Sequence, residues 1–265
     1  METLRSAPDL QSPRAHAHNV TQRRVTRVRS FRVYSEHTGS GEPVVLLHGL
    51  SGSQRWWRYT VPALAREYEV HVLDLVGHGR SRGAARQPTI PEMALLVHDW
   101  MRQLGVTRPH LVGHSMGAQI ALHIAADDAP LRSLTLIDAA GLPRPLSVRE
   151  MTRLLAGVLP PRAWGKPHFI PTIWFDALRA GPRSLVSAGR HLLSDDVTPL
   201  LPRIRVPTLV VWGALDPLIP VEHGRRIADA IAGARLVVFP DAAHNVMCDR
   251  PTEFNRLLLD FLAGA

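Results

Sequence analysis

The chain has a single cysteine, Cys248, and a single lysine, Lys166, among its 265 residues. One cysteine excludes a disulfide within the chain, so nothing in the sequence demands an oxidising compartment and we expect a cytoplasmic location. Cysteine and histidine do not cluster at the spacings of zinc sites, and we expect no metal. No apolar run approaches the roughly 20 residues that a membrane-spanning helix needs, so we expect no membrane span.

Positive charge is concentrated at one end of the chain. The formal net charge is +8, and residues 1–30 contain six arginines against two acidic residues. This leader has little apolar periodicity, which predicts a disordered basic tail over residues 1–22. Arg23-Arg24 is similar to a twin-arginine export signal, but no apolar segment follows it. Because basic residues interleaved with aromatics do not extend over the rest of the chain, we expect no nucleic-acid partner.

Apolar strands alternate with amphipathic helices along most of the remaining sequence. Four apolar runs have the composition of strands covered on both faces: 44–47, 70–74, 134–138 and 208–212. Thr89 and Glu92 form a capping box before a helix with one apolar stripe. Alternating residues at 25–28 and 31–34 predict an antiparallel pair at a sheet edge. The pattern predicts an α/β fold with a mostly parallel, doubly wound sheet.

A stretch rich in proline and aromatic residues interrupts this alternation before the last strands. Ser147 and Glu150 have the spacing of a second capping box, and another helix is expected around the aromatic residues 169–178. We interpret the stretch as a helical lid inserted into the core. The predicted division is a tail at 1–22, a core at 23–140 and 201–265, and the lid at 141–200.

The segment Gly113-His114-Ser115-Met116-Gly117 lies between a short apolar run and a helical repeat. A G-x-S-x-G pattern at such a place is typical of a nucleophile elbow, in which a sharp turn exposes the serine hydroxyl above the sheet. Glycines on both sides suit a turn in which a β-carbon would crowd the backbone. A loop serine that caps the next helix fits the same pattern, so the assignment of Ser115 as nucleophile depends on partners elsewhere.

Asp216 and His244 are the expected partners. Each follows an apolar strand, which places both at the carboxyl edge of a parallel sheet. A serine hydroxyl needs a base to take its proton, and the base needs an acid that orients and stabilises it. The chain order Ser115, Asp216, His244 is the order expected for this elbow. Asp138 also follows a strand and remains an alternative acid.

Other polar residues receive structural interpretations. His48 and His78 are expected to brace loops by hydrogen bonds, and His114 to pack locally within the elbow. Asp74 and Asp241 are interpreted as turn or capping groups. Cys248 is interpreted as a small buried residue.

These motifs together make the chain similar to the α/β-hydrolase fold superfamily, in its serine-nucleophile branch with a lid. The resemblance covers about residues 23–265 through His48-Gly49, Gly77-His78-Gly79-Arg80-Ser81, Gly113-His114-Ser115-Met116-Gly117, Trp212-Gly213-Ala214-Leu215-Asp216-Pro217 and Ala243-His244. It implies that Ser115 is the nucleophile, His244 the general base and Asp216 its partner. It also implies an oxyanion hole formed by the backbone N–H groups of Leu50 and Met116. Haloalkane dehalogenases and epoxide hydrolases of this fold are excluded, because they have aspartate where Ser115 stands.

The expected activity is cleavage of an ester-like bond through an acyl-enzyme: a carboxylic ester, a lactone or a carbon–carbon bond next to a ketone. An acyltransferase or a cofactor-free perhydrolase would use the same triad, and a non-enzymatic small-ligand receptor on this fold could retain it. Five aromatic residues are expected to bind a small apolar acyl substrate: Trp56, Trp57, Phe169, Trp174 and Phe175. No cofactor is expected, because the sequence has neither a dinucleotide loop nor a P-loop. Monomer and dimer both remain open.

Overall fold

The computed structural model describes residues 20–143 and 166–265, and an eight-stranded sheet runs through this part of the chain. The strands are β1 (Gln22–Val28), β2 (Phe31–Thr38), β3 (Glu42–Leu47), β4 (Tyr68–Asp74), β5 (His110–His114), β6 (Ser133–Ile137), β7 (Thr208–Gly213) and β8 (Arg235–Phe239). Their order is β1-β2-β4-β3-β5-β6-β7-β8. The pairs β1–β2 and β2–β4 are antiparallel, and all others are parallel. The predicted mostly parallel, doubly wound sheet is confirmed.

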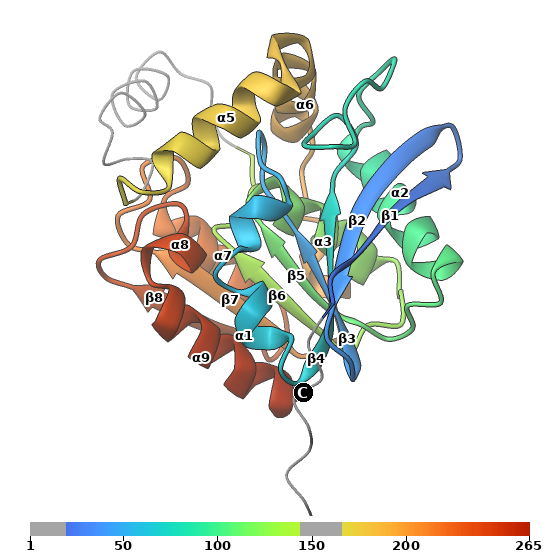
Figure 1. Cartoon of the computed structure of the whole chain (residues 1–265). Coiled ribbons are helices and arrows are strands. Elements are labelled where there is room, and N and C mark those ends of the chain that lie inside the picture. Colours follow the sequence, from blue (N-terminus) through green and yellow to red (C-terminus); the bar gives the residue numbers. More distant parts are fainter. Residues whose placement is uncertain (1–19, 144–165) are drawn as a thin grey trace, which may run out of the picture.

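Helices cover both faces of the sheet (Figure 1). On one face lie α2 (Ile90–Gln103), α3 (Met116–Ala126) and α7 (Val221–Ala230), and on the other α1 (Val61–Leu64), α8 (Val246–Asp249) and α9 (Pro251–Ala263). Successive residues of a strand point to opposite faces, so a strand between two helical layers must be apolar throughout. In β3, Val45 and Leu47 belong to the first layer's core, and Val44 and Leu46 to the second.

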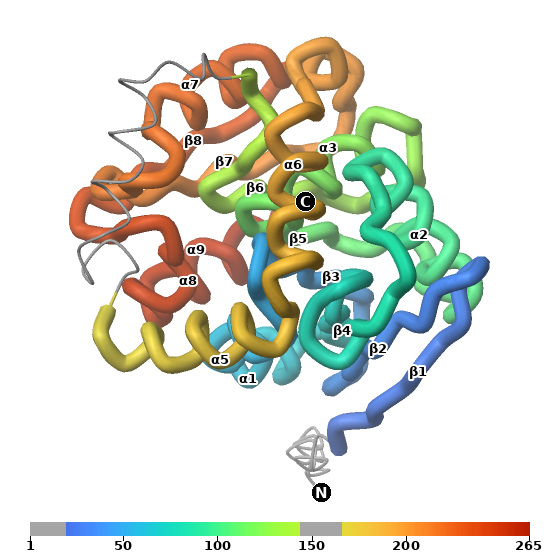
Figure 2. Tube along the Cα trace, turned by 90° about the horizontal axis from the view of Figure 1, so that it is seen from above, coloured from blue at the N-terminus to red at the C-terminus, as the bar shows by residue number. Residues whose placement is uncertain are grey.

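Two further helices lie between β6 and β7 in the chain, above the carboxyl ends of the central strands. They are α5 (Ile170–Ala180) and α6 (Pro182–Ser194), joined at Gly181. Gly181 has φ +78°, a conformation that glycine adopts without steric cost. Figure 2, which looks down on this edge, shows α6 crossing over β5 and β6. A short turn of 3₁₀-helix, η3 (Leu201–Arg203), leads back to β7.

Some predictions concern residues that the structure does not describe. The helix expected after Ser147 lies outside the described residues, as do residues 1–19 of the expected tail. The predicted end of the tail at residue 22 is late by one position, since Gln22 already belongs to β1. Among the helices of the described ranges, none is both long enough and apolar enough to span a membrane.

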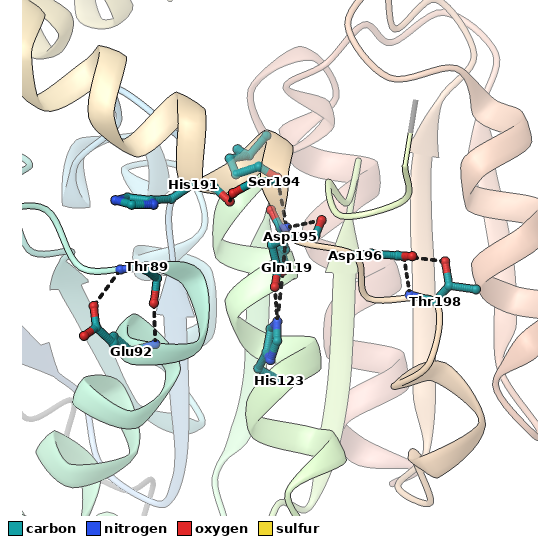
Figure 3. Close-up of polar contacts among 10 residues, drawn as sticks. Thr89, Glu92, Gln119, His123, His191, Ser194, Asp195, Asp196 and Thr198 are labelled. Carbon is teal, nitrogen blue, oxygen red and sulfur yellow. Dashed lines mark hydrogen bonds and ion pairs between the residues drawn. The ribbon is translucent and has the colours of Figure 1, made fainter. Parts of the chain in front are cut away.

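The predicted capping box begins α2. The Thr89 hydroxyl accepts a hydrogen bond from the Glu92 N–H at 3.3 Å, and the Glu92 carboxylate accepts one from the Thr89 N–H at 2.9 Å (Figure 3). Two N–H groups of the first turn, which have no partner within the helix, are thereby satisfied. The apolar stripe that follows is buried against α3 and the sheet, and includes Trp100 at 0% exposure.

Candidate active site

Ser115 lies at the sharp turn between β5 and α3, with φ +52° and ψ −113°. Positive φ is costly for a residue with a side chain and persists only where the surroundings enforce it. Here two glycines allow strand and helix to meet closely. A β-carbon on Gly113 would lie 2.4 Å from the carbonyl oxygen of Gly117, and one on Gly117 would lie 2.3 Å from that of Leu47. The Ser115 N–H donates to the Ile137 carbonyl of β6 at 2.9 Å, which holds the turn against the next strand.

The structure brings Ser115, His244 and Asp216 together. The Ser115 Oγ lies 3.1 Å from His244 Nε2, and His244 Nδ1 lies 2.7 Å from Asp216 Oδ2. The other Asp216 oxygen, Oδ1, accepts backbone N–H groups from Leu218 at 2.7 Å and Ile219 at 3.0 Å. These two donors fix the orientation of the carboxylate, and with it the orientation of the imidazole. The hydroxyl, the ring and the carboxylate are therefore aligned as a hydrogen-bonded chain.

Asp138, the alternative acid, lies close to these three residues but does not take part in their series of hydrogen bonds. It follows β6 with φ +44°, is fully buried, and accepts the Gly213 N–H through Oδ1 at 2.8 Å. Burial, and secondarily the nearby Asp216 carboxylate, raise the pKa of Asp138 well above its ordinary value. Asp216, and not Asp138, contacts His244 Nδ1.

Two buried histidines brace the surroundings of the serine. His48 Nε2 accepts the Leu75 N–H at 3.0 Å, so its Nδ1 carries the proton and donates to the Gly49 carbonyl at 2.8 Å. Burial, together with neighbouring His78, lowers the pKa of His48 to about 3, and the ring is neutral. His114 Nε2 donates to the backbone carbonyl of His244 at 2.7 Å, and the two rings are 4.9 Å apart. Both histidines therefore have the bracing and packing roles expected of them.

The expected oxyanion donors lie on two elements that meet at Ser115. Met116 is the first residue of α3, where backbone N–H groups have no partner within a helix. Leu50 lies in the loop after β3 and lines the same cavity as Ser115. Neither N–H group donates a hydrogen bond within the described part of the chain. Both are thus available to a ligand oxygen, and their assignment stays a prediction.

A cavity of about 430 Å³ opens above Ser115 beneath α5 and α6. Half of its apolar lining residues come from the two helices: Ile173, Trp174 and Ala177 of α5, with Leu185, Leu192 and Leu193 of α6. The polar lining residues are Ser51, His114, Ser115, His223, His244 and Asn245. The described lining residues include no arginine, lysine, aspartate or glutamate. The cavity suits an uncharged, mainly apolar group.

The structure corrects three of the five expected pocket aromatics. Trp56 and Trp174 line the cavity, whereas Trp57 is fully buried in the core on the α9 face. Phe169 is also fully buried and packs edge-on against Trp56, with ring centroids 5.6 Å apart. Phe175 points out to solvent instead of into the cavity. Aromatic composition alone does not reveal which side of a helix faces a cavity, and this is why the prediction fails for these residues.

Sequence reasoning missed the residues that hold α5 and α6 in place. The buried Asp176 of α5 accepts the Ser53 hydroxyl at 2.7 Å. At the end of α6, Asp195 accepts Gln119 Nε2 at 2.8 Å and His123 Nε2 at 2.9 Å (Figure 3). Both contacts join residues more than 70 positions apart, so no local pattern signals them. The cavity-lining leucines of α6 could have been found from their helical spacing.

One group of side chains in the described structure has the proximity of metal ligands. Donor atoms of His114, Asp138 and His244 lie within 4.8 Å of one another. Both nitrogens of His244 are already hydrogen-bonded, to Ser115 and Asp216, and His114 Nε2 donates to a carbonyl. Two donor atoms remain, fewer than zinc sites use. The group fits a hydrogen-bonded cluster and not a metal centre.

Comparison with known proteins places the chain in a family. The model of the alpha/beta hydrolase family matches residues 44–257. The chain belongs to the alpha/beta hydrolase family. Within the alpha/beta hydrolases, it is 26% identical to a thermophilic esterase from Thermogutta terrifontis, with a TM-score of 0.79 over 92% of this chain and 98% of that structure.

Two relatives of this alpha/beta hydrolase align with most of the chain. The 2-hydroxy-6-oxo-6-phenylhexa-2,4-dienoate hydrolase of Comamonas testosteroni is 30% identical, over 88% of this chain and 91% of its own length. The dihydrolipoyllysine-residue acetyltransferase component of the acetoin cleaving system of Pseudomonas putida is 31% identical over 84% of this chain. The aligned region spans 64% of that second relative's length.

Proposed function

We propose that the chain is a serine hydrolase that cleaves an ester-like bond through an acyl-enzyme, with Ser115, His244 and Asp216 as its catalytic triad. The observation that carries the proposal is the hydrogen-bonded chain from the Ser115 hydroxyl to His244 at 3.1 Å and from His244 to Asp216 at 2.7 Å. Such an arrangement on an elbow turn is the one that serine nucleophiles require.

In the acylation step, Ser115 Oγ bonds to the substrate carbonyl carbon while His244 Nε2 takes the hydroxyl proton. The carbonyl π electrons move onto the oxygen, and the N–H groups of Leu50 and Met116 donate to the resulting oxyanion. One such donor contributes about 2.7–4 kcal/mol in comparable sites. Asp216 stabilises the imidazolium, because its carboxylate accepts a hydrogen bond from the Nδ1–H group, which keeps its proton.

The carbonyl then re-forms and the bond to the leaving group breaks, while His244 donates its Nε2 proton to the departing oxygen or carbon. Water repeats the sequence on the acyl-enzyme: His244 takes a proton from water, the hydroxide attacks, and Ser115 leaves with that proton. The net reaction adds one water across the cleaved bond. No cofactor is needed for any of these steps.

The cavity favours a carboxylic ester or lactone with an uncharged apolar acyl group. The dienoate named in the Comamonas testosteroni relative is a carboxylate. The described cavity walls offer no arginine or lysine to such a group, and most of them are apolar side chains. We further propose that the inserted segment at 141–200 is the lid, since its described helices α5 and α6 form the roof over Ser115.

The decisive experiment compares hydrolysis of p-nitrophenyl esters by wild type and Ser115→Ala. We expect the variant to lose more than about 10⁴-fold in kcat. Ser194→Ala, the same substitution at an exposed serine on α6, is the matched control and should hydrolyse at the wild-type rate. Equal rates for Ser115→Ala and wild type would end the proposal. Labelling of Ser115 by a fluorophosphonate without turnover of any ester would instead indicate a receptor.

Acyl transfer is the second candidate, because the Pseudomonas putida relative is named as an acetyltransferase component. The same acyl-enzyme would then pass its acyl group to an alcohol, a thiol or peroxide in place of water. Chromatography of the products formed with added alcohol or peroxide separates the two activities. Free acid as the main product at moderate alcohol concentrations supports hydrolysis.

A further inference from the structure

The outer face of α5 is apolar at the positions where a water-exposed helix is normally polar. Pro171, Trp174, Phe175 and Leu178 are spaced i, i+3, i+4 and i+7, so they form one stripe along the helix. All four are exposed. The exposed fraction is 62% for Trp174, 44% for Phe175 and 78% for Leu178. We call these four residues the α5 stripe. An exposed row of this kind commonly marks a surface that contacts an apolar phase or partner.

The α5 stripe is held outward by contacts on the opposite side of the helix. Asp176 is 1% exposed and accepts the Ser53 hydroxyl at 2.7 Å, which ties the inner face of α5 to the loop that precedes Trp56. Ile173 points from the same side into the cavity. Rotating α5 to bury the stripe would break the Asp176 contact and expose Ile173. The stripe therefore stays at the surface in this fold.

The surroundings of the stripe are cationic. Residues 166–194 contain one lysine and three arginines, and their single acidic residue, Asp176, is buried. The Arg55 and Arg179 guanidiniums lie 4.4 Å and 5.4 Å from the centroid of the Phe175 ring. On the neighbouring α6, Arg183 and Arg190 line a shallow hollow. An apolar row with a rim of arginines is complementary to a surface that is apolar inside and negatively charged outside.

The α5 stripe also reaches the cavity above Ser115. Trp174 lines the cavity and is 62% exposed, and Leu193 of α6 lines it and is 59% exposed. Both side chains thus belong to the cavity wall and to the outer surface. The apolar lining is continuous from the helix exterior to the interior of the site.

We propose that the α5 stripe, together with Arg183 and Arg190 of α6, docks on the surface of an anionic lipid bilayer. Tryptophan and leucine would enter the boundary between headgroups and acyl chains, and the arginines would contact anionic headgroups, as in helices that lie in the plane of a membrane. Docking itself is independent of catalysis. The consequence for substrate, which rests on the proposed function, is that an acyl group passes from the bilayer along Trp174 and Leu193 to Ser115.

The test is flotation of the full chain carrying Ser115→Ala with vesicles, so that binding is measured without turnover. Vesicles of equimolar phosphatidylcholine and phosphatidylglycerol should retain the protein, and pure phosphatidylcholine should retain much less. Leu178→Asp should reduce binding to the anionic vesicles on the order of tenfold, because it places a charge in the apolar row. Arg183→Glu and Arg190→Glu should each reduce binding about fivefold or more, with a smaller salt dependence.

The matched control is Leu95→Asp, the same change at a leucine that is 43% exposed on α2 and belongs to neither α5 nor α6. It should bind vesicles as the parent does. With Ser115 intact, Leu178→Asp should hydrolyse a water-soluble ester at the wild-type rate, since Leu178 does not line the cavity. Equal binding to both vesicle types, or wild-type binding by Leu178→Asp, would overturn the proposal. A dimer in solution that Leu178→Asp dissociates would instead assign the stripe to a second copy of the chain.

Discussion

Replacing Asp216 by asparagine gives the sharpest test of the proposed triad. Asp216 Oδ1 accepts two backbone N–H groups, from Leu218 and Ile219, and Oδ2 contacts His244 Nδ1 at 2.7 Å. In the variant, the amide oxygen must take the Oδ1 position, because an NH₂ group there would face two donors. The NH₂ group is then left facing His244 Nδ1.

The consequence is a change of tautomer in His244. A donor that faces Nδ1 requires this nitrogen to be unprotonated, so the proton moves to Nε2. Nε2 then donates to Ser115 Oγ and no longer accepts its proton, so the general base is lost. We expect kcat to fall about 10⁴-fold, equivalent to about 5 kcal/mol of transition-state stabilisation, with little change in KM. Steady-state hydrolysis of a p-nitrophenyl ester measures both constants.

Asp138→Asn is the matched control in the same pocket. Burial raises the pKa of Asp138 well above its ordinary value, and asparagine reproduces the shape of this side chain and its acceptor for the Gly213 N–H. We expect this variant to keep kcat close to wild type. A larger loss in Asp138→Asn than in Asp216→Asn would refute the assignment of Asp216 as the partner of His244.

Three further predictions concern stability. Burial lowers the pKa of His78 to about 4, so the unfolded chain binds one more proton between that pH and about 6.5. The free energy of unfolding should therefore fall as the pH is lowered through this range. In urea titrations, His78→Leu should make the fall shallower by up to about 1.4 kcal/mol per pH unit. An unchanged slope would contradict a neutral His78 in the folded protein. Gly117→Ala should lower the free energy of unfolding by about 1–3 kcal/mol or more, because its β-carbon would lie 2.3 Å from a backbone oxygen of β3. The control is Gly189→Ala on α6, whose β-carbon would have its nearest neighbour at 3.9 Å, and it should not lower the melting temperature. Asp176→Ala should lower the free energy of unfolding by about 1–3 kcal/mol, and the double variant with Ser53→Ala should be only slightly less stable. If the effects of the two single substitutions added fully, the contact between Asp176 and Ser53 would contribute nothing to stability.

Much of the fold could be predicted because its signals are local. The apolar run of β3 reflects a strand covered on both faces, and Thr89 with Glu92 marks the start of α2. The proximity of Ser115, Asp216 and His244 also followed from local signals. Each residue follows a strand, and parallel strands end at the same edge of their sheet.

Contacts between distant segments could not be predicted in this way. Asp176 meets Ser53 across 123 positions, and Asp195 meets His123 across 72, and each carboxylate alone resembles an ordinary surface residue. The side of α5 that faces the cavity was likewise hidden, because both of its sides are apolar. The sequence therefore predicts Phe175 at the cavity, whereas its ring lies outside it.

Ser115 directly precedes α3, and one and two turns later this helix presents Gln119 and His123 to the end of α6. Ser115 and the roof above it are consequently positioned by the same helix, α3. Side chains on the cavity side of α6 can be replaced without changing the contacts between α3 and the end of α6. Substitutions there are therefore expected to alter the substrate preference and to leave the geometry at Ser115 unchanged. The cavity lining on α6 and the position of Ser115 before α3 can thus vary independently.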